Sequence, residues 1–300
     1  MITLLGATGN VGSKIAGILL RENQRVRVIS RSFDKAKSFR RLGAEVYVGD
    51  AADSSFLTNA FTGSDGVFTL LPPDFKSTDY LSLQDRVGES IAGALRASGV
   101  KFVVNLSSTG ADLADGNGPI KGLHKQEERL NALDLNVLHL RPVYFMENLL
   151  MNIDLIRTMG IMGSALKGDL RMPMIATRDI AAAAADALIK RNFPGKRVRD
   201  LLGQRDLTMD ETAKIIGKKI GKSDLKYVAF SYDDALKGMV GAGLSENVSR
   251  LYLEMSKGMN DGLFGGTKIR RTPDNTTATP VEEFADVFAE AYRSKMTKAA

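Results

Sequence analysis

The sequence predicts an α/β protein: a Rossmann-type, doubly wound parallel sheet with a smaller α+β C-terminal subdomain. Three observations predict this fold. Strands and helices alternate with short connections through the first half, the strands are nearly continuous apolar runs, and a glycine-rich turn joins the first strand to the first helix. Apolar strands of this kind are typical of parallel sheets that helices cover on both faces. Right-handed crossovers between such strands then give the doubly wound arrangement.

The predicted elements of the first half follow in order. An apolar run marks Ile2–Leu5 as the first strand, and the helical spacing of apolar residues predicts a helix over Asn10–Arg21. Asp53 is the expected N-cap of the third helix, because its carboxylate can accept from free N–H groups, and Gly99 ends the fourth helix. The other predicted strands are 25–30, 45–49, 66–71, 101–107 and 136–140, and the other predicted helices are 34–42, 54–61, 80–98 and 123–133.

The second half of the chain is less regular. We expect a helix over 145–159, a glycine-rich loop over 160–168, a helix over 178–190 and an amphipathic C-terminal helix over 282–292. Short strands are expected at 197–202 and 226–230, each followed by a helix. Residues 1–150 are expected to form the nucleotide-binding core, and 151–300 a smaller substrate-binding subdomain packed against it as one compact unit.

Composition excludes several classes of protein. The chain has 300 residues with no cysteine and two histidines, which rules out disulfide scaffolds, thiolate metal sites, cysteine nucleophiles and histidine-rich metal sites. We therefore expect no metal. The net charge of +6 is scattered and not interleaved with aromatic residues, so no nucleic-acid partner is expected. No apolar run of about 18 residues and no basic leader is present, which predicts a cytoplasmic protein without a membrane span.

The strongest chemical signal is the run Gly6-Ala7-Thr8-Gly9-Asn10-Val11-Gly12 between the first strand and the first helix. In a dinucleotide-binding loop, the first glycine permits the tight turn, the second lets backbone approach a pyrophosphate, and the third lets the helix pack near the strand. The helix start offers N–H groups and a positive dipole end to the anion. The alternative is a glycine-rich turn without a ligand. The predicted cofactor contacts here are Gly6, Thr8, Gly9, Asn10, Val11 and Gly12.

The residues after the second predicted strand indicate which nicotinamide cofactor is bound. An acidic residue at this place would bind the ribose 2′-hydroxyl of NAD, but the strand ends in Ile29-Ser30-Arg31-Ser32. A guanidinium suits a 2′-phosphate through charge-assisted hydrogen bonds, and Lys35 follows on the next helix. We therefore predict that NADP(H) is preferred over NAD(H). The alternative is a solvated basic helix start.

Further candidates share one place in the fold, the carboxyl ends of predicted strands, where open α/β sheets bind ligands. Asp50 could accept from the adenine amino group or be a turn residue. The apolar trio after the fourth strand could line the cofactor or belong to the core. The two serines after the fifth strand could bind the nicotinamide side or simply end the strand. These candidates are Asp50, Leu70, Leu71, Pro72, Ser107 and Ser108.

Three segments together carry a resemblance to a known family. They are the Gly6–Gly12 run, Leu106-Ser107-Ser108, and Leu140-Arg141-Pro142 followed by Phe145-Met146-Glu147-Asn148. With them, the chain as far as residues 177–181 resembles the NmrA-like group of atypical short-chain dehydrogenases/reductases. The group includes NADPH-dependent quinone and azo-dye reductases, isoflavone-reductase-like enzymes and redox-sensing regulators. The resemblance implies a Rossmann core with a small C-terminal substrate subdomain.

The sequence departs from active short-chain dehydrogenases at the proton relay. Those enzymes carry a Tyr, and a Lys four residues later, on the helix after the fifth strand. Here Ile120 takes the Tyr position and His124 the Lys position, and a shift by one residue gives Lys121 and Lys125 instead. Either alignment lacks the Tyr. This argues against alcohol dehydrogenation and sugar-nucleotide epimerisation, but not against hydride delivery to a quinone, azo or enone acceptor.

His124 is the best acid/base candidate, because an unperturbed histidine titrates near physiological pH. It could equally bind the nicotinamide ribose or be structural. His139, within an apolar strand, is expected to be a hydrogen-bonded sheet residue. The resemblance implies that the loop with Pro142, Tyr144 and Phe145 lines the cofactor and acceptor pocket, with Tyr144 as a second catalytic candidate. The alternative for this loop is an ordinary helix start.

The function predicted from these observations is an NADPH-dependent oxidoreductase that transfers hydride to a conjugated acceptor, such as a quinone or azo compound. The expected partner is thus a small aromatic or quinone-like molecule. The alternative is a non-catalytic, NADP(H)-binding redox sensor, which the missing Tyr favours. In that case we expect a protein partner, and for either function a homodimer is conceivable.

Overall fold

A seven-stranded parallel sheet forms the centre of the computed structural model, which describes residues 1–266 and 268–297. The strands lie in the order β10-β6-β5-β4-β1-β2-β3, and each neighbouring pair is parallel. The strand order reverses direction between β1 and β4, and the carboxyl ends of the strands at such a reversal are where open α/β sheets bind ligands. The strands are β1 (Ile2–Leu5), β2 (Val26–Ser30), β3 (Glu45–Val48), β4 (Gly66–Thr69), β5 (Phe102–Leu106), β6 (Asn136–Pro142) and β10 (Lys196–Leu201).

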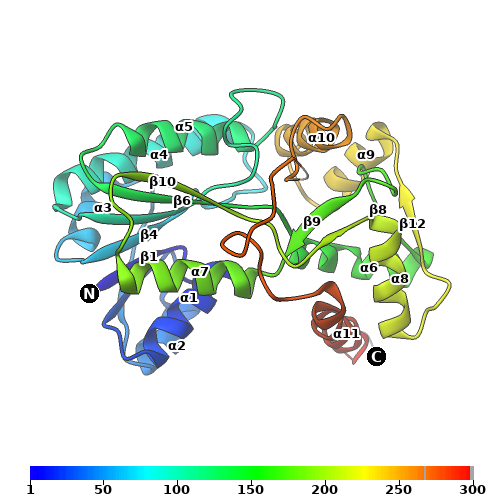
Figure 1. Ribbon diagram of the computed structural model, residues 1–300, viewed down its shortest axis with the longest axis horizontal. Coiled ribbons are helices and arrows are strands. Elements are labelled where there is room, and N and C mark those ends of the chain that lie inside the picture. The colour runs from blue at the N-terminus through cyan, green and yellow to red at the C-terminus, as the bar shows by residue number, and fades with distance from the viewer. Residues whose placement is uncertain (267, 298–300) are drawn as a thin grey trace.

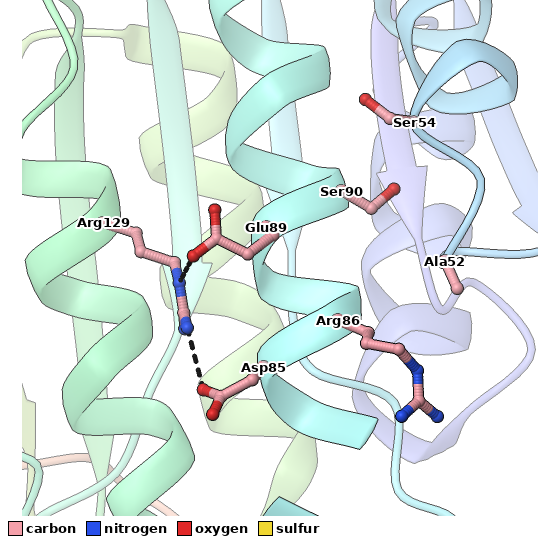
Figure 2. Close-up of a pocket in the computed structure, with 7 residues that line it drawn as sticks. All are labelled: Ala52, Ser54, Asp85, Arg86, Glu89, Ser90 and Arg129. Carbon is pink, nitrogen blue, oxygen red and sulfur yellow. Dashed lines mark hydrogen bonds and ion pairs between the residues drawn. The ribbon is translucent and has the colours of Figure 1, made fainter. Parts of the chain in front are cut away.

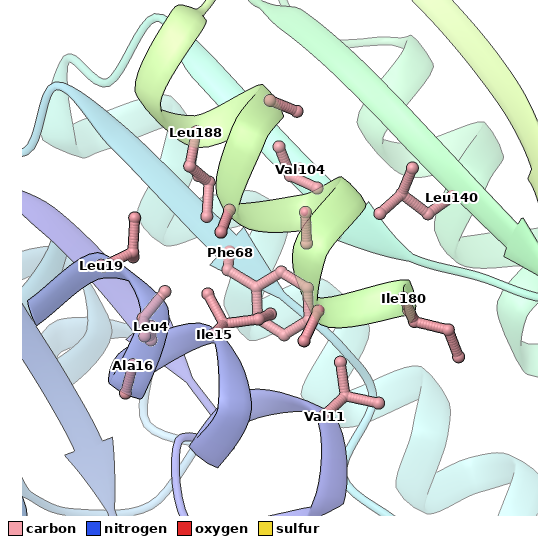
Figure 3. Packing of buried hydrophobic residues seen from close by; sticks show 14 of the residues in the cluster. Leu4, Val11, Ile15, Ala16, Leu19, Phe68, Val104, Leu140, Ile180 and Leu188 are labelled. Carbon is pink, nitrogen blue, oxygen red and sulfur yellow. The ribbon is translucent and has the colours of Figure 1, made fainter. Parts of the chain in front are cut away.

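Helices cover both faces of this sheet (Figure 1). One face packs against α1 (Asn10–Arg21), α2 (Phe33–Arg41) and α7 (Thr177–Lys190), and the other against α3 (Ser54–Phe61), α4 (Tyr80–Ser98) and α5 (Ile120–Asn131). Successive strand residues point to opposite faces: Phe68 packs with α1 and α7, as Figure 3 shows, whereas Val67 packs on the other side. Both are fully buried, and each such side chain contributes about 1.5–3 kcal/mol.

Two predicted helix-end residues of the first half are confirmed. Asp53 accepts from Phe56 N at 2.9 Å, as an N-cap should, and Gly99 ends α4 in a left-handed conformation. The helix predicted over 123–133 begins earlier, at Ile120, and the strand predicted over 136–140 continues to Pro142. These differences are one to three residues at element ends, where local signals are weakest.

The rest of the chain forms a second layered unit with its own core. A three-stranded sheet has the order β11-β9-β7, and β12 pairs with β8 in a parallel two-stranded sheet. Methionine, leucine and phenylalanine side chains from these strands and their helices make a separate buried cluster. The elements are β7 (Tyr144–Phe145), η1 (Met146–Asn152), α6 (Ile153–Met159), β8 (Ile161–Ser164), β9 (Met172–Ile175), β11 (Asp206–Leu207), α8 (Met209–Ile220), β12 (Lys226–Ala229), α9 (Tyr232–Gly241), α10 (Glu246–Asn260) and α11 (Val281–Thr297).

Three expectations for the second half are corrected. The helix predicted over 145–159 is instead a short strand, a 3₁₀ turn and α6, because β7 pairs with β9. The loop predicted over 160–168 contains β8, whose hydrogen-bonding partner β12 lies far along the chain. The strand near 197–202 is followed by β11 before the next helix, and it joins the main sheet beside β6. Residues beyond 150 therefore complete the main sheet.

Within the residues that the structure describes, no helix has both the length and the apolar character needed to cross a membrane.

Candidate active site

The turn between β1 and α1 has the backbone geometry of an anion-binding loop. Gly6 has a φ of +74°, a conformation that residues with side chains rarely adopt, and Gly9 N donates to Gly6 O at 3.0 Å. A Cβ atom at Gly12 would overlap Gly6 O, so only glycine fits where α1 passes the turn. Gly9 precedes α1 in an extended conformation, and no side chain among the described residues caps the helix. The first N–H groups of α1 are therefore left for an anion.

The other residues predicted to contact the cofactor in this turn have different environments. Thr8 and Asn10 are exposed at its rim. Val11 is 5% exposed, and its side chain packs among the buried residues between α1 and α7 (Figure 3). Only the backbone of Val11 can therefore face an anion at the start of α1.

Arg31 and Lys35 lie in and just after the turn from β2 to α2. Both are exposed, and no ion pair within the described residues holds either side chain. The turn itself is fixed, because the Ser30 hydroxyl donates to Ser32 O at 2.9 Å and accepts from Ser32 N at 3.1 Å. The structure thus presents two unpaired cations from an ordered turn.

The predicted residues at the other strand ends on this side differ in their roles: one forms a turn, and the others pack against the glycine turn or the core. Asp50 Oδ1 accepts from Ala52 N at 3.0 Å, which makes Asp50 a turn residue and leaves its second oxygen for other contacts. A Cβ atom placed on Gly6 would lie 2.8 Å from Leu70 Cδ2, so Leu70 covers the glycine turn directly. Leu71 is buried in the core on the other face of the sheet, and Pro72 is half-buried.

At the end of β5, Ser107 belongs to a buried polar cluster. Its hydroxyl donates to Glu127 Oε1 at 2.5 Å, and Glu127 is only 5% exposed. The Arg141 guanidinium holds the same carboxylate through Nε to Oε1 at 2.9 Å and Nη2 to Oε2 at 2.5 Å. Because the Ser107 proton is directed at Glu127, the hydroxyl presents only its lone pairs to the strand end.

Arg141 also faces two more carboxyl groups. Its Nη1 lies 3.7 Å from Asp112 Oδ1, and the hydrogen bond to Glu127 raises the Arg141 pKa. Burial raises the pKa of Asp200 on β10, the negative charges of Asp112 and Glu127 add to this, and Arg141 opposes it. A single guanidinium therefore faces several carboxyl groups beside Ser107.

Backbone hydrogen bonds tie the loops after β5 and β6 together. Ser107 N donates to Leu140 O at 2.8 Å, and Thr109 N donates to Pro142 O at 3.1 Å. The Ser108 hydroxyl donates to Thr109 O at 3.0 Å, so Ser108 braces its own loop. Pro142 is buried as the last residue of β6, and Phe145 packs against the core cluster shared by α1 and α7. The predicted nicotinamide-side residues thus lie along two adjoining loops.

Tyr144 is half-buried on β7, and its ring packs against the core of the second unit. Burial raises the pKa of Tyr144 well above its usual value, so the phenol keeps its proton. Its side chain makes no hydrogen bond within the described residues. The structure therefore places Tyr144 at the border of the second core, and no hydrogen bond within the described residues joins it to His124.

His124 lies in the first turns of α5, next to the loop after β5. Its Nδ1 is 2.8 Å from Ala111 O, and because a carbonyl only accepts, Nδ1 carries a hydrogen. Nε2 lies 3.6 Å from Glu128 Oε1. The neutral ring thus has its lone pair at Nε2, and only the protonated ring has a hydrogen to give from that atom.

The other residues of the two alignments are occupied. Ile120, at the position of the usual Tyr, is buried. Lys121 Nζ pairs with Asp115 at 2.6 Å and with Glu254 at 2.8 Å, while Lys125 Nζ pairs with Asp85 at 2.9 Å. Both lysines are thus held in ion pairs, which leaves His124 as the candidate from this stretch.

His139 is confirmed as a hydrogen-bonded sheet residue. Thr69 Oγ1 donates to Asn105 Oδ1 at 3.1 Å, and Asn105 Nδ2 donates to His139 Nδ1, also at 3.1 Å. His139 Nε2 then donates to Asn131 Oδ1 at 3.0 Å. Burial lowers the pKa of His139 from 6.5 to about 4, so the ring stays neutral. It has no atom left for catalysis.

A hollow of about 680 Å³ lies elsewhere, on the outer side of α3, α4 and α5. Figure 2 shows that Arg129 on α5 donates to Glu89 and to Asp85 on α4 across it. None of the predicted cofactor residues lines it, so we assign the active site to the strand ends and not to this hollow. The residues that line the hollow are Ala52, Ser54, Asp85, Arg86, Glu89, Ser90 and Arg129.

Three residues that contribute to this region were not predicted as site residues from the sequence. Glu127 lies three residues after His124 on α5, and Arg141 lies on the next strand. The three-residue spacing indicates that Glu127 shares a helix face with His124, but its pairing with Arg141 can be inferred only once α5 is known to lie over β6. Glu147, within the segment that carries the resemblance, accepts from Thr177 N at 3.1 and 3.0 Å and from the Thr177 hydroxyl. It fastens the start of α7 to the turn after β7.

Comparison with proteins of known activity places the chain among reductases. The NAD(P)H azoreductase of Xenophilus azovorans is 27% identical over 299 residues, which cover 97% of this chain and 98% of that protein. The (4-alkanoyl-5-oxo-2,5-dihydrofuran-3-yl)methyl phosphate reductase of Streptomyces griseus is 28% identical over 292 residues, 97% of each chain.

Solved structures share the whole architecture. An NADPH-dependent quinone oxidoreductase of Escherichia coli in complex with NADPH matches with a TM-score of 0.80 at 24% identity, covering 96% of this chain and 99% of that one. The triphenylmethane reductase of Citrobacter sp. in complex with NADP(H) matches with a TM-score of 0.79 at 21% identity, covering 96% and 100%. At these identities the likeness establishes the fold. The model of the NmrA-like family matches residues 1–285, and the chain therefore belongs to the NmrA-like family.

Proposed function

We propose that this protein is an NADPH-dependent reductase that transfers hydride to a conjugated acceptor, such as a quinone or an azo compound. The observation that carries the proposal is the uncapped start of α1 behind a turn in which only glycine fits at position 12. When bound there, the reduced nicotinamide supplies the hydride. The named activity of the azoreductase relative, which matches nearly the whole chain, supports the acceptor class.

Two groups of residues would bind the charged parts of the cofactor. The Gly6–Gly12 turn holds the pyrophosphate, and Arg31 with Lys35 binds the 2′-phosphate, which gives the preference for NADP(H). Their exposure and lack of ion-pair partners within the described residues support that role. The residues proposed along the rest of the cofactor are Thr8, Asn10, Asp50, Leu70, Leu71, Pro72, Ser107, Ser108, His124, Pro142 and Phe145, with Val11 acting through its backbone.

Proton supply falls to His124 or to solvent. The Nδ1–H bond to Ala111 O fixes the ring, so Nε2 is the atom that releases a proton from the charged form. Tyr144 keeps its phenolic proton, and we propose that it lines the acceptor pocket and donates a hydrogen bond there. With Ile120 in place of the usual Tyr, the site suits acceptors that need little help from a strong acid.

A fluorescence titration with NADPH and with NADH tests the proposal, followed by addition of quinones and azo dyes to the same samples. Tight NADPH binding and acceptor-dependent oxidation are expected. Replacing His124 by Ala should lower kcat about a hundredfold, the lower end of the range for one acid–base group, and weaken NADPH only by the loss of one contact; an unchanged kcat would remove His124 from the reaction. Tight binding without oxidation by any acceptor would refute the reductase and favour a redox sensor.

A further inference from the structure

The segment that follows α10 crosses from the second unit to the strand ends of the main sheet (Figure 1). Leu263 N donates to Gly258 O at 2.8 Å, which turns the chain back at the end of α10. A Cβ atom on Gly116 would lie 2.8 Å from Leu263 Cδ2, and one on Gly266 would lie 2.7 Å from Val143 Cγ1. The segment thus contacts both the β5–α5 connection and the corner after β6.

Phe264 is the aromatic residue of this segment, and its ring is clamped between two glycines. A Cβ atom on Gly110 would lie 2.8 Å from Phe264 Cδ2, and one on Gly258 would lie 2.8 Å from Phe264 Cε1. These atoms belong to opposite edges of the ring. Gly110 has a φ of +88°, so both its conformation and the nearby ring call for glycine there. The ring position is therefore fixed before any ligand arrives.

The ring lies next to groups already assigned to the site. Gly110 is joined to Ala111, whose carbonyl holds His124, and it follows the Ser107–Thr109 stretch that is tied to β6. Phe264 is half-buried, so part of its ring surface remains accessible. A gap of about 30 Å³ adjoins it, lined in part by Leu170, Met172 and Met259. The gap has the volume of about one water molecule, so these side chains pack close to the ring, and an aromatic side chain held in place offers its accessible surface to a flat aromatic ligand.

We propose that Phe264 is a specificity-determining residue of the acceptor site, which favours conjugated acceptors with two rings over those with one. The inference rests on the proposed function, because it assigns part of the acceptor pocket of that same reductase. On this proposal, the second ring of a two-ring acceptor stacks on Phe264, and a one-ring acceptor bound at the loops after β5 and β6 lacks that contact. A clamped side chain loses little conformational freedom on binding, so little of the favourable free energy of stacking is offset by lost entropy.

Direct binding tests this without relying on turnover. The protein is saturated with NADP⁺ and titrated by calorimetry with menadione, a two-ring quinone, and with duroquinone, a one-ring quinone. The chain has no cysteine, so thiol addition to the quinones does not interfere. Phe264→Ala should weaken menadione about tenfold and duroquinone less than about threefold, the range expected for one aromatic contact. Phe264→Leu, which keeps an apolar side chain, should lose about threefold for menadione.

The two proposals fail in distinguishable ways. Equal menadione affinity in wild type and Phe264→Ala, or no menadione binding by wild type, would overturn the role of Phe264. Absence of NADPH oxidation with every acceptor would overturn the reductase even if menadione binds through Phe264. NADP⁺ affinity should be the same in all three proteins; a parallel loss of NADP⁺ affinity would show a general disturbance of the strand ends and count against the inference.

Discussion

At the end of the site that would hold the pyrophosphate, one turn between β1 and α1 supplies Gly6, Gly9 and Gly12. At the other end, the loop after β5 supplies Ser107, α5 supplies Glu127 and the segment after α10 supplies Phe264. The first end depends on backbone shape and on space that a single Cβ atom would fill. The second depends on hydrogen bonds and packing between side chains from distant parts of the chain.

This difference predicts how each end responds to change. At the glycine end, a substitution should weaken cofactor binding in proportion to the backbone space that the new side chain takes, with little effect on the rest of the molecule. At the Ser107 end, removing one member leaves a buried partner unsatisfied, so loss of stability should accompany loss of function. Four predictions test this contrast, beginning with the largest expected change in free energy.

Glu127→Ala should be the most damaging, because Arg141 would keep a largely buried guanidinium without its two-point partner. We expect the free energy of unfolding to fall by about 3–5 kcal/mol. Urea denaturation measures this. Glu89→Gln is the matched control, because the Glu89 side chain is 70% exposed and its partner Arg129 keeps Asp85 at 2.8 Å, and it should change stability by less than about 1 kcal/mol. Similar losses for the two variants would remove the contrast between the buried and the exposed pair.

Burial of neutral His139 should make the free energy of unfolding depend on pH. Its folded pKa of about 4 lies below the usual 6.5, so the unfolded chain binds more protons between these values. The contribution of His139 is therefore complete above pH 6.5 and is lost as pH falls to 4, by about 3 kcal/mol in total. Denaturation at a series of pH values should show a shallower slope for His139→Gln; the same slope in both proteins would show that His139 is not buried neutral.

Gly12→Ala should weaken NADPH at least about a hundredfold, because the added Cβ displaces the Gly6 carbonyl and with it the anion site. Gly17→Ala on the same helix is the control. Its Cβ would lie 3.5 Å from Arg21 Nη1, an ordinary contact, so binding should be kept and stability should rise by about 0.5–1 kcal/mol. Fluorescence titration and thermal unfolding measure the two effects. Normal NADPH binding by Gly12→Ala would contradict the assignment of this turn.

Arg31→Ala should have the smallest effect, about a tenfold loss of NADPH affinity with NADH affinity unchanged, because only the 2′-phosphate loses a partner. Lys37→Ala is the control, since Lys37 pairs with Asp34 at 3.4 Å on the exposed side of α2. Titrations of each variant with both cofactors decide the matter. If NADH weakens as much as NADPH, Arg31 does not bind the 2′-phosphate.

Much of the main sheet was predictable because its signals are local. The apolar strands, the Asp53 cap, the end of α4 at Gly99 and the structural role of His139 were all readable from short segments. The second unit was less predictable, because β8 is glycine-containing and becomes a strand only through pairing with β12. A strand whose partner lies far along the chain gives no strong signal in its own residues.

The sequence by itself determined the β1–α1 turn, since its glycines act on each other within seven residues and need only the local backbone path. It also determined the basic Arg31 turn and the absence of the usual Tyr. Only the tertiary structure decided that Glu127 meets Ser107 and Arg141, and that Phe264 lies against Gly110. These contacts join residues that lie far apart along the chain and meet only when helices and sheets pack together. No local pattern of residues determines which partners that packing brings together.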